Sequence, residues 1–187
     1  MNTANKLTLL RILLIPVFIF FALAGFIPFN SIIAVAVFAA ASITDMLDGH
    51  IARSRELITD FGKFIDPLAD KMLVSAAFIT FVEQGYFSAV AVIVIIMREF
   101  IVTSLRLIAS GSGQIIPAGS WGKIKTTVQM TAIILILLIN ENFLTDIIGS
   151  GYIYIINEVV QWIVVAATAI SGIRYLWDNR KLIDTKK

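Results

Sequence analysis

The chain has 187 residues; 58% of them are hydrophobic, 15% are charged, and the formal net charge is +2. A mean hydropathy of +0.89 lies outside the range of soluble domains and indicates the lipid bilayer as the solvent. The sequence contains no cysteine, which excludes disulfide bonds and thiolate metal sites.

Apolar segments separated by short polar turns predict an all-α integral membrane protein with one domain over residues 1–187. The length provides for about six spans of about 20 residues each. We expect six transmembrane helices, short loops and an N-terminal juxtamembrane helical segment. The expected spans cover residues 7–28, 31–53, 66–84, 87–109, 123–141 and 152–177.

The positions of lysine and arginine predict the orientation of these spans. Six spans place both termini on one side, and the three turns on the opposite side contain no lysine or arginine. By the positive-inside rule, both termini and the aspartate-rich segment 44–72 face the cytoplasm. We expect a bacterial inner membrane, because the chain is compact and shows no transit peptide.

The first span also has features of a cleavable signal peptide. Lys6 and Arg11 precede an apolar run, and small residues follow at 22–25. We favour an uncleaved span, because its removal would take a packing partner from the helices behind it.

Residues 44–72 hold five aspartates, and four of them recur at helical spacing. At about 100° per residue, Asp45 and Asp48 share a face at the end of the second span with Gly49 and Ala52. At the start of the third span, Gly62, Asp66 and Asp70 share another face, and Pro67 would fit the first helical turn. Two antiparallel helices would therefore bring four carboxylates together at the membrane surface.

Four converging carboxylates repel one another unless cations lie between them. Oxygen ligands without histidine or cysteine favour Mg²⁺, Mn²⁺ or Ca²⁺ over zinc, and Mg²⁺ held in this way usually acts on phosphates. A pair of ions would stabilise the attacking and leaving oxygens of a phosphoryl displacement. Solvated loop charges paired with Arg53, Arg55, Lys63 and Lys71 are the simpler alternative; the helical spacing and the two glycines favour the metal site.

The segment 45–70 resembles the signature of the CDP-alcohol phosphotransferase family, D-x2-D-G-x2-A-R, then at least eight residues, then G-x3-D-x3-D. All eight fixed positions are present: Asp45, Asp48, Gly49, Ala52, Arg53, Gly62, Asp66 and Asp70. The six-span layout is also similar to that family. The resemblance implies transfer of a CDP-linked phosphoryl group to an alcohol, with release of CMP.

The resemblance also implies roles for individual residues. Asp45, Asp48 and Asp66 would hold two Mg²⁺ ions, with Mn²⁺ as an alternative, and Asp70 would be a metal ligand and the base that deprotonates the acceptor. The residues implied to bind CDP-diacylglycerol are Gly49, Ala52 and Arg53, together with Asn5 and Thr8 of the segment NKLTLLR. Thr8 is equally well explained as a helix cap. A homodimer formed through the third and fourth spans is implied as well.

Two further segments resemble the phosphatidylglycerophosphate synthase branch of the family: MREFIVTSLR at 97–106 and WGKIKTTVQ at 121–129. That resemblance implies CDP-diacylglycerol as donor and sn-glycerol 3-phosphate as acceptor. An acceptor with its own phosphate needs a cationic pocket, for which the candidates are Arg98, Arg106, Lys123 and Lys125. These four would otherwise be interfacial anchors, and Glu99 would then be the structural ion-pair partner of Arg98.

Other functions remain open at this stage. A sibling enzyme would use phosphatidylglycerol, serine or inositol phosphate as acceptor. A small cation transporter would use the four aspartates as its ion site, although such a site is expected near the membrane midplane. A structural scaffold would not need the aspartates, and no nucleic-acid partner is expected.

Overall fold

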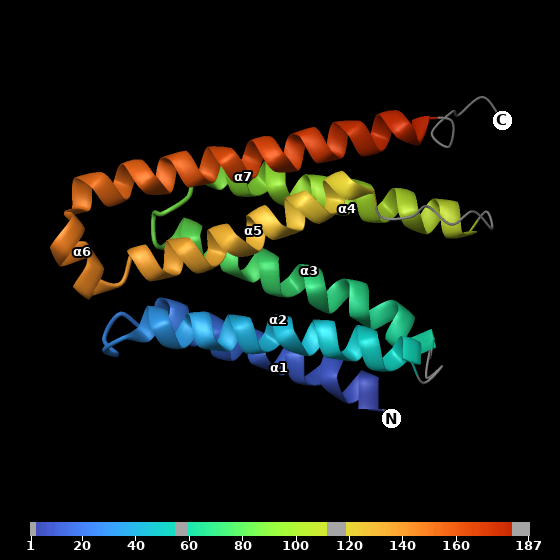
Figure 1. The fold of residues 1–187 in the computed structure, drawn as a ribbon, viewed down its shortest axis with the longest axis horizontal. Coiled ribbons are helices and arrows are strands. Elements are labelled where there is room, and N and C mark those ends of the chain that lie inside the picture. Colours follow the sequence, from blue (N-terminus) through green and yellow to red (C-terminus); the bar gives the residue numbers. More distant parts are fainter. Residues whose placement is uncertain (1–2, 55–59, 112–118, 181–187) are drawn as a thin grey trace.

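A computed structural model describes residues 3–54, 60–111 and 119–180 of the chain (Figure 1). Within these residues the protein is all-helical and contains no strand, which confirms the predicted class. The seven helices are α1 (Thr3–Leu23), α2 (Asn30–Ser54), α3 (Asp60–Glu83), α4 (Ala89–Gly111), α5 (Ser120–Ile139), α6 (Asn142–Ile148) and α7 (Ser150–Asp178).

Six long helices lie where the six spans were predicted, but three of the predicted boundaries were wrong. The first helix ends at Leu23 rather than near residue 28, since a turn follows in which Phe29 has a positive φ of 58°. The third begins at Asp60, so Pro67 lies inside the helix, where it removes one backbone hydrogen bond. The turn predicted between the last two spans contains the short helix α6. The N-terminal segment expected to lie beside the membrane is continuous with α1.

Within the described residues, α1, α5 and α7 are long and apolar enough to cross a membrane, and Asn30–Thr44 of α2 is a shorter apolar stretch. Helix α4 differs from these three because Arg98, Glu99 and Arg106 interrupt its apolar sequence. Large apolar side chains cover the outside of the bundle; Leu13 is 62% exposed and Ile173 is 65% exposed. An apolar exterior of this kind suits lipid, as the composition predicted.

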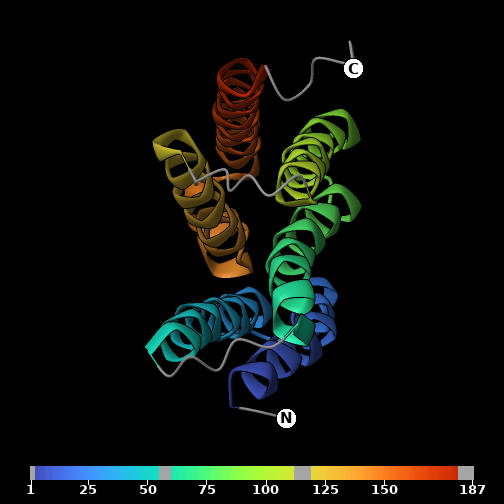
Figure 2. The same ribbon diagram turned by 90° about the vertical axis from the view of Figure 1, so that its right-hand side faces the viewer.

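The helices alternate in direction along the bundle, except that α6 is a short connection (Figure 1). The N-terminus, the end of α2, the start of α3, the end of α4 and the start of α5 therefore lie at one end, together with the end of α7. Figure 2 looks onto that end and shows α1–α3 on one side and α4, α5 and α7 on the other. The turns at this end are those that the sequence predicted to be cytoplasmic.

Helix α1 packs against both α2 and α3. Ala22, Ala41 and Ala77 are fully buried in this group, and small side chains allow close approach of helices. The rings of Phe18 and Phe38 lie 5.8 Å apart between α1 and α2. At the far end, the side chain of Gln84 donates a hydrogen bond of 2.8 Å to the carbonyl of Ala22, which fixes α3 against the end of α1.

Helix α7 packs against α4 and α5, and buried amides join these helices. Asn140 and Asn157 exchange two hydrogen bonds of 3.0 and 3.2 Å between the end of α5 and α7. Deeper in the group, Gln129 donates to the hydroxyl of Thr168 at 3.2 Å. Because apolar packing alone leaves helices free to slide, these polar contacts help to set the register of α5 against α7.

Glu141, in the turn between α5 and α6, connects the two helix groups. Its carboxylate accepts a 3.1 Å hydrogen bond from the backbone N–H of Ser31, and the residue is only 5% exposed. Ser31 lies in the first turn of α2, where backbone N–H groups have no partner within the helix and the helix dipole favours an anion. The glutamate therefore caps α2 from the opposite half of the bundle.

We expect Glu141→Ala to lower the free energy of unfolding by about 1.5–3 kcal/mol, the usual contribution of a hydrogen bond to a charged group. Thermal unfolding in detergent would measure the loss. Asp146→Ala, which removes an exposed carboxylate from α6, is the matched control and should leave the transition unchanged. Equal midpoints for the two variants would contradict the capping role.

Candidate active site

The predicted metal and nucleotide residues lie on two helix ends that face the same way. Asp45, Asp48, Gly49, Ala52 and Arg53 occupy the last three turns of α2, and Gly62, Asp66 and Asp70 occupy the first three turns of α3. Helices α2 and α3 are in contact and meet at the end shown in Figure 2. The side chains of these residues lie outside the described part of the structure, so their roles as metal ligands and CDP-diacylglycerol contacts stay predictions.

The backbone arrangement fits a site for divalent cations. Two adjacent helix ends carry four residues whose carboxylate oxygens are the donors that Mg²⁺ prefers, and no histidine or cysteine belongs to the set. The residues that would hold the ions are Asp45, Asp48, Asp66 and Asp70.

Helix α1 contributes a buried cation close to this motif. Arg11 is fully buried, and Thr8, one turn earlier, is 1% exposed. Counted from the turn that joins α1 to α2, Arg11 lies about level with Ser42, one helical turn before Asp45. From the sequence, Arg11 was only one of two basic residues before the first apolar run. Arg11 is therefore a buried cation in the helix that packs against both α2 and α3. Asn5 lies in the first turn of α1, and its side chain is outside the described part.

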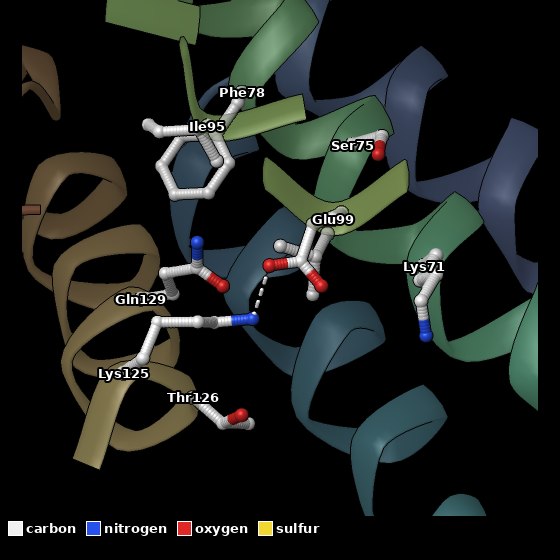
Figure 3. Close-up of a pocket in the computed structure, with 9 residues that line it drawn as sticks. Lys71, Ser75, Phe78, Ile95, Glu99, Lys125, Thr126 and Gln129 are labelled. Atoms are coloured by element: carbon white, nitrogen blue, oxygen red, sulfur yellow. Dashed lines mark hydrogen bonds and ion pairs between the residues drawn. The ribbon is translucent and has the colours of Figure 1, made fainter. Parts of the chain in front are cut away.

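A narrow cleft adjoins the motif between α3, α4 and α5 (Figure 3). Its volume is about 20 Å³, enough for about one water molecule, so a larger ligand would have to push its walls apart. The residues that line it are Lys71, Val74, Ser75, Phe78, Ile95, Glu99, Lys125, Thr126 and Gln129. Lys71 directly follows Asp70 in α3, which places one wall of the cleft beside the predicted catalytic residue.

Glu99 joins two of the predicted acceptor-binding cations at this cleft. Its Oε1 atom lies 2.6 Å from Nζ of Lys125, as Figure 3 shows. The same oxygen lies 3.1 Å from Nη1 of Arg98. The side chains of all three residues are largely buried, with exposed fractions of 14% for Glu99, 8% for Lys125 and 11% for Arg98. The structure thus confirms that Glu99 is an ion-pair partner of Arg98, and it adds Lys125 to the pair.

Helix α7 holds Arg98 from the other side. Nη2 of Arg98 lies 2.7 Å from the hydroxyl oxygen of Ser171. The next residue, Gly172, has no side chain where the arginine passes: a Cβ atom there would come within 2.8 Å of Cγ of Arg98. The sequence analysis missed both residues. A Ser-Gly pair inside an apolar span was the available signal, since such pairs permit close approach of another chain segment.

Of the four predicted acceptor residues, only Lys125 lines the cleft; Arg98 contacts the lining residue Glu99, and the other two are exposed. Arg106 is exposed, and its Nε donates a 3.2 Å hydrogen bond to the hydroxyl of Tyr175. Lys123 is also exposed, while Lys125, two residues later, is buried in the cleft wall. The structure therefore brings Arg98 and Lys125 together and leaves the proposed roles of Arg106 and Lys123 as predictions.

Comparison with protein families matches residues 1–173 to the CDP-alcohol phosphatidyltransferase family. A Bacillus subtilis protein named CDP-diacylglycerol–glycerol-3-phosphate 3-phosphatidyltransferase is 41% identical to this chain, with 98% of each chain covered. Proteins of the same name from Rickettsia felis and Pseudomonas fluorescens are 37% and 39% identical; the aligned region covers 93% and 97% of this chain, and 93% of each relative. These matches confirm the resemblance seen in the motif: this chain belongs to the CDP-alcohol phosphatidyltransferase family.

Proposed function

We propose that this chain transfers the phosphatidyl group from CDP-diacylglycerol to sn-glycerol 3-phosphate, forming phosphatidylglycerophosphate and CMP in phospholipid synthesis. The support for the reaction is the signature between Asp45 and Asp70, together with relatives named for this activity, one of them 41% identical. The observation that carries the choice of acceptor is the cleft. Its lining includes the buried Lys125 and also Lys71, the residue that follows Asp70, so a cationic wall would lie near the proposed base for an acceptor phosphate to bind.

In the proposed reaction, an acceptor hydroxyl oxygen forms a bond to the β-phosphorus of CDP-diacylglycerol. The bond from that phosphorus to the bridging oxygen of CMP breaks, and CMP leaves with the electron pair. Asp70 takes the proton of the attacking hydroxyl. Mg²⁺ held by Asp45, Asp48, Asp66 and Asp70 would supply stabilisation of negative charge on the phosphate oxygens. The residues proposed to bind the CDP-diacylglycerol headgroup are Asn5, Thr8, Gly49, Ala52 and Arg53.

Lys125 and Arg98 would bind the phosphate of the acceptor. A lysine and an arginine are the usual phosphate-binding side chains, and burial strengthens their interaction with an anion. The 2.6 Å contact with Glu99 and the 2.7 Å contact with Ser171 hold both cations in place before the acceptor arrives. Arg106 and Lys123, at the same end of the bundle, would attract the anionic acceptor from solution.

The same proposal includes the placement in the membrane. All six long helices would cross a bacterial inner membrane, with both termini and the motif at the cytoplasmic face. The acyl chains of the donor would then stay in lipid while its nucleotide reaches the motif. A homodimer through α3 and α4 would cover some of their exposed apolar side chains, among which are Ile79, Met97 and Phe100.

Purified protein supplied with CDP-diacylglycerol and Mg²⁺ is expected to release CMP with sn-glycerol 3-phosphate, and not with serine, inositol phosphate or phosphatidylglycerol. Asp70→Asn should lower the rate at least about 100-fold, because it removes the proposed base. Asp146→Asn, an exposed carboxylate far from the motif, should leave it unchanged. Release with another acceptor would overturn the choice of acceptor, and no release with any would overturn the enzymatic proposal.

The structure separates two lysines that the sequence treats alike. Lys125→Met is expected to raise KM for glycerol 3-phosphate by about 10- to 100-fold, the effect of losing one charged hydrogen bond, with little change in KM for CDP-diacylglycerol. Lys123→Met should change both constants less than about threefold at moderate salt, since an exposed cation is screened. Steady-state CMP release measures both. Equal effects of the two substitutions would argue against the cleft as the phosphate site.

Removal of divalent cations by a chelator is expected to abolish CMP release, and added Mg²⁺ or Mn²⁺ should restore it. Asp48→Asn should raise the Mg²⁺ concentration needed for half-maximal activity, because one negatively charged ligand is lost. Asp178→Asn at the exposed end of α7 serves as the control. Full activity in the chelated enzyme would contradict the proposed metal pair.

A further inference from the structure

The two carboxylate oxygens of Glu99 have different surroundings. Oε1 accepts the contacts from Lys125 and Arg98 at 2.6 and 3.1 Å. Both of the Glu99 side-chain hydrogen bonds in the described part of the structure go to Oε1, and none goes to Oε2. Figure 3 shows this second oxygen turned away from Lys125, toward the side of the cleft on which Lys71 lies. An ionised carboxylate oxygen thus faces the cleft as an open hydrogen-bond acceptor.

A carboxylate in this position needs an explanation beyond charge pairing. The cleft would bind a phosphate through its cations, and a negative group beside that phosphate lowers its affinity. The contacts with Lys125 and Arg98 both go to Oε1, which leaves the lone pairs of Oε2 available to another donor. Oε2 adds something that cations cannot supply, because Lys and Arg are donors only, whereas a hydroxyl proton needs an acceptor.

We propose that Oε2 of Glu99 accepts a hydrogen bond from the hydroxyl of the acceptor that does not react, and that Glu99 thereby selects a diol phosphate. This inference rests on the proposed function, in which the acceptor is sn-glycerol 3-phosphate and its terminal hydroxyl attacks. The secondary hydroxyl is on the carbon between the phosphate-bearing carbon and the reacting carbon. It would therefore lie between the cations that bind the phosphate and Asp70. The carboxylate that positions the cations would therefore also bind the neighbouring hydroxyl.

Glu99 would influence both the affinity for the acceptor phosphate and the choice between acceptor molecules. Lys125 and Arg98 recognise the phosphate, and both take their positions from the same carboxylate that would contact the hydroxyl. A phosphate ester without the secondary hydroxyl would leave Oε2 facing an apolar carbon after the cleft has lost its water. Sites that bind a substrate hydroxyl discriminate strongly against analogues that lack it, since the polar group of the protein is then left without a partner.

The test compares two acceptors in three forms of the full-length protein. kcat/KM for CMP release would be measured with sn-glycerol 3-phosphate and with 3-hydroxypropyl phosphate, which keeps the phosphate and the terminal hydroxyl but lacks the secondary one. The forms are the unaltered enzyme, Glu99→Gln and Glu99→Ala, with Glu83→Gln at the exposed far end of α3 as the matched control. Loss of stability or displacement of Lys125 lowers both rates alike and cancels in their ratio.

The unaltered enzyme and Glu83→Gln are expected to prefer glycerol 3-phosphate by about 10- to 100-fold, the value of a hydrogen bond to a charged group. Glu99→Gln should reduce that preference at least about fivefold, and Glu99→Ala should bring it close to one. A preference that survives both substitutions, or one absent from the unaltered enzyme, overturns the inference and leaves Glu99 as an ion-pair partner alone. An unaltered enzyme that releases no CMP with glycerol 3-phosphate overturns the proposed function, and the inference with it.

Discussion

A charged side chain inside this apolar bundle requires a partner from another helix, because an unpaired charge removed from water costs several kcal/mol. Glu99 of α4 satisfies this requirement for Lys125 of α5, and it also holds Arg98 toward α7. Glu141 connects the α5–α6 turn to the start of α2 in a similar way. Apolar surfaces allow many registers, whereas a short ion pair allows one. These two glutamates therefore join the amide contacts of α5 and α7 in setting the relative heights of the helices, on which the positions of the cleft and of the motif depend.

The sequence predicted the helices well because the signals for them are local. Apolar runs of sufficient length and the turns between them appear directly in the composition of each segment. The errors arose where a local signal competed with packing. Pro67 suggested the first turn of a helix, but α3 begins at Asp60 and continues through the proline. Residues 142–148 were predicted as a turn because they are few, although they form a short helix whose first backbone hydrogen bonds go to the carbonyl of Glu141. Whether α3 and α4 cross the membrane is harder to predict from the sequence, because the charged residues in these helices make their composition ambiguous.

The aspartate motif could be predicted from the sequence more fully than the cleft. The aspartate motif lies within 26 residues on consecutive helix ends, so helical periodicity and one antiparallel turn are enough to predict that it converges. The cleft combines residues that are far apart: Lys125 is 26 positions from Glu99, and Ser171 is 73 positions from Arg98. Both cations were recognised as candidates from the sequence, but so were Arg106 and Lys123, which are exposed. Burial distinguishes the pairs, and burial depends on how α4, α5 and α7 pack.

Helix α3 is the element that connects the two parts. Its first turns carry Asp66 and Asp70, and the next residue, Lys71, already belongs to the wall of the cleft. The cleft holds about 20 Å³, so in the proposed reaction the acceptor would have to displace at least one of its walls. Movement of α4 or α5 would disturb the ion pairs of Glu99, whereas movement of α3 would leave them intact. A shift of α3 would also carry the proposed base with it, because Asp70 and Lys71 share one turn. Asp70 and Lys71 are thus consecutive residues of one helix, which joins the aspartate motif to the cleft.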